Sequence, residues 1–245
     1  LTFDLCETAN EVAGYDGAVV DELRRRGVPA TIFVGGHWAA THPARFREIA
    51  ADPRFEIANH TWTHANLRLV DAERLTREIL APEAAFREAG YEARSRFLRF
   101  PFGACDARSL KAVAEAGMAA IQWDVSTGDP SPLTSADAIV ATTLREVRPG
   151  SIVLAHANGR GFNTAKALPR ILDRLAADGF RFVTVGDLLT RGRPVITATC
   201  YDAKPGDTDK YDHWTAPTGR KPSTVPLPEP QTASPGAPAP APAAT

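Results

Sequence analysis

Two histidines, His60 and His64, are separated by three residues in the segment Asn-His-Thr-Trp-Thr-His. If this segment becomes helical after the strand expected at 55–58, both imidazoles lie on one face and can hold a single metal ion. A pair of polar loop histidines is the competing interpretation, because the spacing alone is a short pattern. The position directly after an expected strand favours the metal interpretation.

Three more chemically capable side chains follow expected strands. Asp4 ends the run Leu-Thr-Phe-Asp, and a carboxylate there can act as a general base, a metal ligand or a helix cap. Arg99, in Arg-Phe-Pro-Phe-Gly, can hold such a carboxylate ionised through charge-assisted hydrogen bonds. His156 follows an apolar run and fits a packed neutral residue, a third metal ligand or a general acid.

Two aspartates are candidate partners of His156. Asp124 and Asp129 lie in Trp-Asp-Val-Ser-Thr-Gly-Asp-Pro, and either could stabilise the protonated imidazole. Asp129 also suits a plain turn position before Pro130.

The elements that position these residues alternate between short β-branched runs and amphipathic stretches. Seven strand–helix units predict an α/β fold, a parallel barrel of about seven strands inside a ring of helices. An open doubly wound sheet is the competitor, but no glycine-rich phosphate loop follows the first strand. In a parallel barrel, the carboxyl ends of the strands share one rim, so the candidate residues would meet there. The expected strands are 1–5, 30–34, 55–58, 97–101, 119–125, 152–155 and 180–185, and the expected helices are 18–26, 70–89, 106–116, 135–147 and 164–177.

Composition limits the class of protein further. The chain has 245 residues and a net charge of −1, which argues against a nucleic-acid partner. It holds no apolar run of about 18 residues, so no bilayer span is expected. It opens on a strand pattern instead of a signal peptide. We expect one domain over 1–200, then a polar segment and a disordered Pro/Ala-rich tail over 201–245.

Taken together, the residues resemble the polysaccharide deacetylase (NodB homology) domain, carbohydrate esterase family 4. The resemblance spans about 1–189, and five motifs occur in the order of the family. They are Leu1–Asp4, His60–His64 as His-(Ser/Thr)-x-x-His, Arg99–Gly103 as Arg-x-Pro-x-Gly, Trp123–Pro130, and Leu154–His156 as Leu-x-His.

The resemblance implies a distorted (β/α) barrel and a hydrolase that removes N-acetyl groups from amino sugars of peptidoglycan, chitin-like oligomers or exopolysaccharide. His60 and His64 would hold a divalent cation, usually zinc in this family, with cobalt, nickel or manganese as alternatives. Asp4 would be the catalytic base, Arg99 would position it, and His156 would protonate the leaving amine.

The same resemblance assigns residues to the substrate. The backbone N–H of Phe102 would help to bind the oxyanion, and Leu154 would shape the pocket for the acetyl methyl group. Trp123 and Asp124 would belong to the substrate-binding wall, and Asp129 would be the partner of His156 that the fourth motif retains.

Two departures from the family pattern stand out. Leu5 occupies the place of a second aspartate that is the third metal ligand in the family, and leucine cannot bind a metal. Asp16, Glu7 or a water molecule could replace it, and we favour Asp16. The fourth motif usually reads Asp-x-x-Asp-Trp, but here only Asp129 is retained.

The cysteines suggest one bridge. Cys6 and Cys105 follow the first and third motifs, which should be neighbours on the rim, so we predict a disulfide between them; two buried thiols are the alternative. Cys200, near the polar tail, is expected to stay free.

Two other functions remain open at this point. One is an amidohydrolase acting on a small nitrogenous compound, and the other is a non-catalytic carbohydrate-binding relative. By analogy with the family, an N-acetylated glycan is the expected partner, and the expected location is secreted or in the cell envelope.

Overall fold

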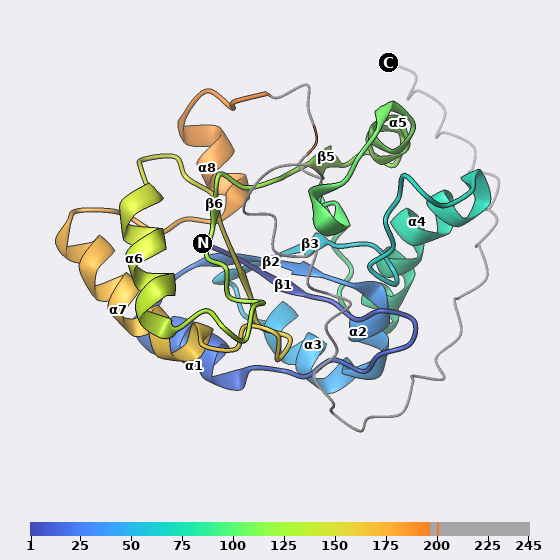
Figure 1. Ribbon diagram of the computed structural model, residues 1–245. Coiled ribbons are helices and arrows are strands. Elements are labelled where there is room, and N and C mark those ends of the chain that lie inside the picture. The colour runs from blue at the N-terminus through green and yellow to red at the C-terminus, as the bar shows by residue number, and fades with distance from the viewer. Residues whose placement is uncertain (197–199, 201–245) are drawn as a thin grey trace, which may run out of the picture.

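The computed structural model describes residues 1–196 and 200, and it places a single parallel sheet at the centre of this region (Figure 1). Seven strands pair in the order β5-β4-β3-β2-β1-β7-β6. Every adjacent pair is parallel. The strands are β1 (Thr2–Leu5), β2 (Ala30–Val34), β3 (Phe55–Asn59), β4 (Phe97–Leu98), β5 (Ala119–Ala120), β6 (Val125–Ser126) and β7 (Val153–His156).

The sheet curls into a half-barrel that is open between β5 and β6. Within residues 1–196, these two strands form the edges and do not pair with each other. The central strands β1, β2 and β7 are buried along their whole length. Such two-sided burial is expected of parallel strands that helices cover. The predicted α/β class and distorted barrel of about seven parallel strands are therefore confirmed.

Eight α-helices and one short 3-10 turn surround the sheet in the described part of the chain (Figure 1). Their ends follow local sequence signals: Gly27 ends α1 in the left-handed conformation, and Asp106 begins α5 with a capping box. The helices are α1 (Gly17–Arg26), α2 (Gly36–Thr41), α3 (Pro43–Ala50), α4 (Ala72–Glu88), α5 (Ala107–Glu115), α6 (Ala136–Glu146), α7 (Thr164–Ala177) and α8 (Val185–Arg191), with the 3-10 turn η1 at Pro101–Gly103.

Two expected strands are wrong. The run 119–125 is split into β5 and β6, which lie on opposite edges of the sheet. The run 180–185 forms no strand; it leads into α8, where Thr184 caps the first turn. Phe180 and Phe182 pack against the α6–α7 cluster, whereas Val185 packs with Phe33, Ala58 and Phe97 of the sheet. The predicted tail over 201–245 lies outside the described residues.

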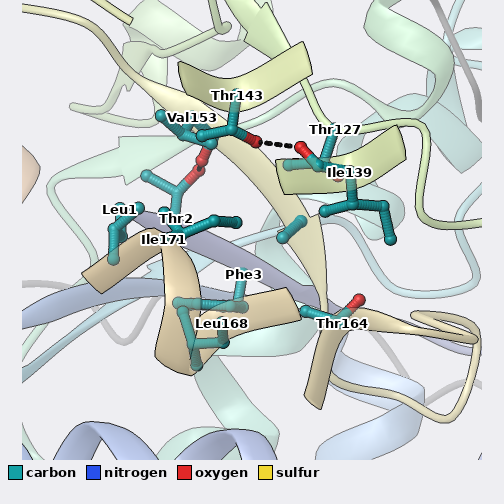
Figure 2. Close-up of a pocket in the computed structure, with 11 residues that line it drawn as sticks. Leu1, Thr2, Phe3, Thr127, Ile139, Thr143, Val153, Thr164, Leu168 and Ile171 are labelled. Carbon is teal, nitrogen blue, oxygen red and sulfur yellow. Dashed lines mark hydrogen bonds between the residues drawn. The ribbon is translucent and has the colours of Figure 1, made fainter. Parts of the chain in front are cut away.

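A small apolar cavity lies between β1, β7 and the helices α6 and α7 (Figure 2). Aliphatic side chains, threonines and Phe3 line it, and none of its lining side chains carries a carboxylate, an imidazole or a thiol. It is therefore a gap in the core behind the site described below. Across residues 1–196, no helix is both long and apolar enough to cross a membrane.

Candidate active site

The carboxyl ends of β1 and β7 bring two predicted residues together. Asp4 and His156 are direct partners in the register of these strands. At the other end of the two strands, the hydroxyl of Thr2 donates to the carbonyl of Val153, 151 positions further along the chain. Asn59, the last residue of β3, pairs with Leu98 of β4, so His60 and Arg99 follow side by side. The predicted rim is thus formed by strand register.

Asp4 and Arg99 form an ion pair that is completely buried. Arg99 Nη1 donates to Asp4 Oδ1 at 2.8 Å, and neither side chain is exposed to solvent. The guanidinium lies 4.0 Å from the ring centroid of Phe33 and 5.5 Å from that of Trp123. Two aromatic faces and one carboxylate therefore fix the guanidinium, which in turn fixes Asp4.

His60 is oriented by the same strand end. Its Nδ1 lies 2.9 Å from the backbone carbonyl of Arg99. Because a carbonyl oxygen only accepts, Nδ1 carries the proton, and Nε2 presents a lone pair. That Nε2 lies 3.3 Å from Asp4 Oδ2, an oxygen that accepts no hydrogen bond from the described residues. This tautomer is the one that a metal-binding imidazole needs.

The segment between His60 and His64 is a loop, so the expected helical turn is wrong. Thr61 and His64 adopt left-handed backbone conformations, with φ of 65° and 55°. The two imidazole centroids are nevertheless 5.0 Å apart. Left-handed geometry is uncommon for residues other than glycine and often marks a functional site. The loop achieves the juxtaposition that we expected from a helix.

Helices α4 and α2 hold this loop from both sides. Glu78 of α4 is fully buried; its Oε2 accepts the N–H groups of Trp62 and Thr63 at 3.0 and 2.8 Å, and its Oε1 accepts the Thr63 hydroxyl. At the start of α2, the N–H of Gly36 donates to the carbonyl of Thr61 at 2.9 Å. A Cβ on Gly36 would come within 2.4 Å of the Trp62 ring. Only glycine allows this close approach.

His156 is paired with Asp129. Its Nδ1 lies 2.9 Å from Asp129 Oδ1, and its backbone N–H donates to Oδ2 at 2.7 Å. The hydroxyl of Thr164 also donates to Oδ2, at 2.6 Å. Asp129 therefore orients the ring through Nδ1.

Asp124 lies elsewhere, which corrects its predicted role beside His156 and in the substrate-binding wall. Its carboxylate accepts from the hydroxyl of Ser151 at 2.8 Å and from the N–H of Ile152 at 2.6 Å. Ile152 precedes the first residue of β7, whereas His156 is the last. Asp124 therefore caps the opposite end of this strand.

Three further predicted residues lie around the rim. The ring of Phe102 lies against that of His64, with centroids 4.8 Å apart and planes tilted by 60°, and its backbone is left-handed with φ of 60°. Trp123 packs over Arg99 as described, and Leu154 is fully buried two residues before His156, on the same face of β7.

Cys6 completes a cluster with the two histidines. One ligand atom from each of Cys6, His60 and His64 lies within 4.8 Å of the others, and all three residues are buried. Burial alone would raise the pKa of the Cys6 thiol, but the neighbouring imidazoles of His64 and His60 outweigh it and lower the pKa to about 7.

Asp16 does not join this cluster, which corrects its predicted role as the third metal ligand. It is the residue before α1, and its backbone N–H donates to the carbonyl of Ala157 at 2.8 Å. Burial raises the pKa of Asp16, and the charge of Asp129 adds to this effect, so Asp16 lies on the His156 side. Glu7, the other candidate for the third ligand, contacts a different histidine: its Oε2 lies 2.9 Å from His37 Nδ1.

The predicted disulfide is also wrong. Cys105 pairs with Cys200, and Cys6 is a buried free thiol. Cys105 lies in an apolar cluster against α4 and α5 that also contacts Cys200. Cys6, directly after β1, instead lies beside the histidines.

Sequence reasoning therefore missed three contributors to the site. Cys6 was considered only as half of a disulfide, although it directly follows the position of the missing aspartate. Glu78 looked like one of many charges on an amphipathic helix. Asn158, two residues after His156, donates from Nδ2 to the carbonyl of Cys6 at 2.9 Å and contacts its Sγ at 3.4 Å. No local pattern marks such a contact across 152 residues.

Comparisons with known proteins agree with this geometry. The polysaccharide deacetylase family model matches residues 1–121. A chitooligosaccharide deacetylase of Sinorhizobium fredii is 40% identical over 156 residues, which are 64% of this chain and 70% of the relative. A peptidoglycan-N-acetylglucosamine deacetylase of Bacillus cereus is 34% identical over 170 residues, 68% of this chain and 60% of the relative.

Solved structures share the fold. The Bc1960 peptidoglycan N-acetylglucosamine deacetylase is 30% identical and superposes with a TM-score of 0.69, covering 79% of this chain and 88% of its own. A family 4 pseudoenzyme from Bacillus anthracis, 23% identical, has the same fold with a TM-score of 0.67, covering 77% of this chain and 65% of its own.

The half-barrel of parallel strands carries a buried Asp–Arg pair, a histidine pair and an Asp–His pair at one rim, and the relatives that share its sequence are named as deacetylases, hydrolases that act on the amide bonds of N-acetylated sugars. This chain belongs to the polysaccharide deacetylase family, carbohydrate esterase family 4.

Proposed function

We propose that this protein is a metal-dependent deacetylase of N-acetylated glycans, and that it hydrolyses the acetamido group of N-acetylglucosamine units. The observation that carries the proposal is the pairing of Asp4 with Arg99 and His60 at one strand end, directly beside His156 in the register. The relatives are named chitooligosaccharide and peptidoglycan deacetylases, which supports this substrate class.

The donor set fits a divalent cation. His60 turns toward the site an Nε2 that has no hydrogen-bond partner among the described residues, and His64 lies beside it. Imidazole nitrogens suit zinc, cobalt and nickel better than magnesium or calcium. A bound divalent cation would supply Lewis-acid activation of water and of the amide carbonyl.

Asp4 then acts as the general base. Arg99 holds its carboxylate in place and directs Oδ2 toward the space beside His60, where it can take a proton from the attacking water. The backbone N–H of Phe102 supports the oxyanion of the tetrahedral intermediate, since its left-handed residue lies against His64.

His156 acts as the general acid. The amine of an amino sugar is a poor leaving group until it is protonated, so the carbon–nitrogen bond breaks as His156 Nε2 delivers a proton. Asp129 holds the ring and favours its protonated form. The products are acetate and a free amino sugar. Leu154 and Trp123 would shape the wall that receives the acetyl methyl group.

The location that fits best is outside the cytoplasm, in the envelope or secreted. The Cys105–Cys200 disulfide supports this, because such bonds persist in oxidising compartments. Peptidoglycan, the substrate in the names of two relatives, is an envelope polymer.

The test is acetate release from chitooligosaccharides and from peptidoglycan, with protein stripped by a chelator and reloaded with zinc or cobalt. We expect activity only after reloading, loss of metal in His60→Ala, and normal activity in the matched control Asp124→Asn, whose carboxylate lies at the far end of β7. Folded, metal-loaded protein that binds these glycans without releasing acetate would contradict the proposal and favour a non-catalytic relative. Release of ammonia or amine from small cyclic amides, but not of acetate from glycans, would favour the amidohydrolase alternative.

A further inference from the structure

The family's third metal ligand is missing from this chain, and a different atom occupies the appropriate place. We propose that the Cys6 thiolate is the third protein ligand, so that the metal centre is His60, His64 and Cys6. The inference rests on the proposed function and deepens it. Its basis is the buried cluster in which one nitrogen from each histidine and Cys6 Sγ lie within 4.8 Å of one another.

The path of the chain explains why Cys6 can take this role and Leu5 cannot. Leu5 is fully buried in the apolar core with Phe3 and Val19. Cys6 follows it and lies on the other side of the chain, the side of Asp4, because successive side chains of an extended segment alternate. The donor has therefore moved by one residue along the sequence, and an aspartate at position 5 would have to leave the core to reach the histidines.

The surroundings hold Cys6 in place. Asn158 Nδ2 donates to its carbonyl at 2.9 Å and contacts Sγ at 3.4 Å, which suits a thiolate. A Cβ on Gly35 would come within 3.3 Å of the Cys6 Cα, so β2 approaches this residue closely. On the next residue, Glu7 accepts the N–H of Ala13 at 3.0 Å and the hydroxyl of Thr41 at 2.8 Å. These contacts fix the loop before any metal binds.

Sulfur changes which metals the site prefers. Three protein ligands with an open fourth position are typical of catalytic zinc, and thiolate is a recognised member of such sets. A thiolate favours zinc and cobalt over the harder manganese and magnesium ions. We therefore expect this protein to discriminate against manganese more strongly than a variant with a carboxylate ligand.

The experiment uses cobalt as a spectroscopic probe. The chain has three cysteines, and two are bridged, so any sulfur-to-cobalt charge-transfer band in the near ultraviolet must come from Cys6. The full chain, kept oxidised at Cys105–Cys200, is titrated with Co(II) and then with Zn(II). The variants are Cys6→Ser, Cys6→Asp and, as an outer contact, Asn158→Ala.

We expect one cobalt per chain and a charge-transfer band in the wild type. Cys6→Ser should lose the band and bind zinc more than about 100-fold more weakly. Asn158→Ala should keep the band and bind zinc roughly 10- to 100-fold more weakly, the usual cost of losing a contact to a metal ligand. Cys6→Asp should bind metal without the band and gain tolerance for manganese.

Each failure has a distinct meaning. One bound cobalt that depends on His60 but gives no band, with Cys6→Ser unchanged, would overturn the thiolate ligand and leave the proposed deacetylase intact. A normal band without acetate release from any glycan would support the thiolate ligand and overturn the proposed function. If folded protein whose Cys6 thiol is reduced binds no cobalt, both the thiolate ligand and the proposed metal-dependent function are overturned.

Discussion

Two aspartates, Asp4 and Asp52, contact arginines at similar distances but in different surroundings. At the rim, Asp4 and Arg99 meet at 2.8 Å with no exposure on either side. On the outside of α1, Asp52 meets Arg24 at 2.9 Å and Arg54 at 2.7 Å, and both arginines reach solvent. The distances are alike, but the surroundings differ.

Burying an ion pair costs free energy, so a fully buried pair needs an explanation other than stability. Removing two charges from water carries a penalty of several kcal/mol per ion, which their mutual attraction only partly offsets. A buried pair is therefore a poor device for stability, and the Asp4–Arg99 pair fits the oriented general base that we propose. Asp52 is buried too, but its arginines stay in contact with solvent, so its pairs incur less of that penalty. These pairs join α1 to the segment before β3.

The variant Asp4→Asn tests most directly whether the buried pair serves catalysis. Asparagine keeps the shape and can still accept from Arg99, so the fold and metal content should be retained. We expect kcat to fall by about 100- to 10,000-fold, because the general base is lost. Acetate-release kinetics measure kcat, and metal analysis of the same sample measures the metal content. Turnover equal to the wild type would remove Asp4 from the role of base.

The next largest effect is expected from Arg99→Met. Loss of the guanidinium leaves Asp4 charged and buried, which should lower the free energy of unfolding by about 3–5 kcal/mol. Chemical denaturation measures this. In the double variant Asp4→Asn/Arg99→Met, the unpaired charge is gone, and stability should recover in part. If the two changes simply add, the buried charge is not the cause.

Much of this arrangement could be predicted from the sequence, for a physical reason. Asp4, Arg99 and His156 follow strands whose alternation with helices is visible locally, and parallel strands bring their carboxyl ends to one rim. Once the strand order is right, these positions follow. The α/β class and the deacetylase family were accordingly predicted correctly.

The remainder depends on long-range contacts and on unusual backbone. Thr61 and Phe102 adopt left-handed conformations that no local preference of threonine or phenylalanine suggests. The partner of Cys105 was missed because 95 residues separate it from Cys200, and the connectivity of cysteines cannot be deduced from sequence alone. Asp16 was favoured as a ligand only because it is acidic and close in sequence.

A third test concerns the loop that carries the histidines. Glu78→Gln replaces one acceptor oxygen with a donor that would face the N–H groups of Trp62 and Thr63. We expect a loss of about 1–3 kcal/mol in unfolding free energy and a roughly 10- to 100-fold weaker zinc affinity. Glu73→Gln, an exposed residue of the same helix, is the control and should change neither. Equal zinc affinity in Glu78→Gln and wild type would show that the loop holds its shape without this carboxylate.

The smallest effect is expected on the outside of α1. Hydrogen bonds from Arg54 lower the pKa of Asp52, burial of the carboxyl raises it, and the hydrogen bond from Arg24 lowers it further. The net result is a pKa well below the usual value of about 4. Because the folded pKa is depressed, the stabilisation is fully present above the unfolded pKa and is lost as pH falls toward the folded one. Asp52→Asn should therefore cost about 1–2 kcal/mol at neutral pH, less below about pH 4, with kcat unchanged.

Denaturation curves at several pH values measure this dependence, and Asp137→Asn is the matched control. Asp137 also pairs with an arginine, Arg170, but its side chain is 84% exposed, so it should change stability by less than about 0.5 kcal/mol at any pH. A constant gap between Asp52→Asn and wild type down to strongly acidic pH would mean that packing, and not charge, accounts for the effect. A fall in kcat would mean that the outer pair also supports the rim, and the contrast between the two pairs would then no longer hold.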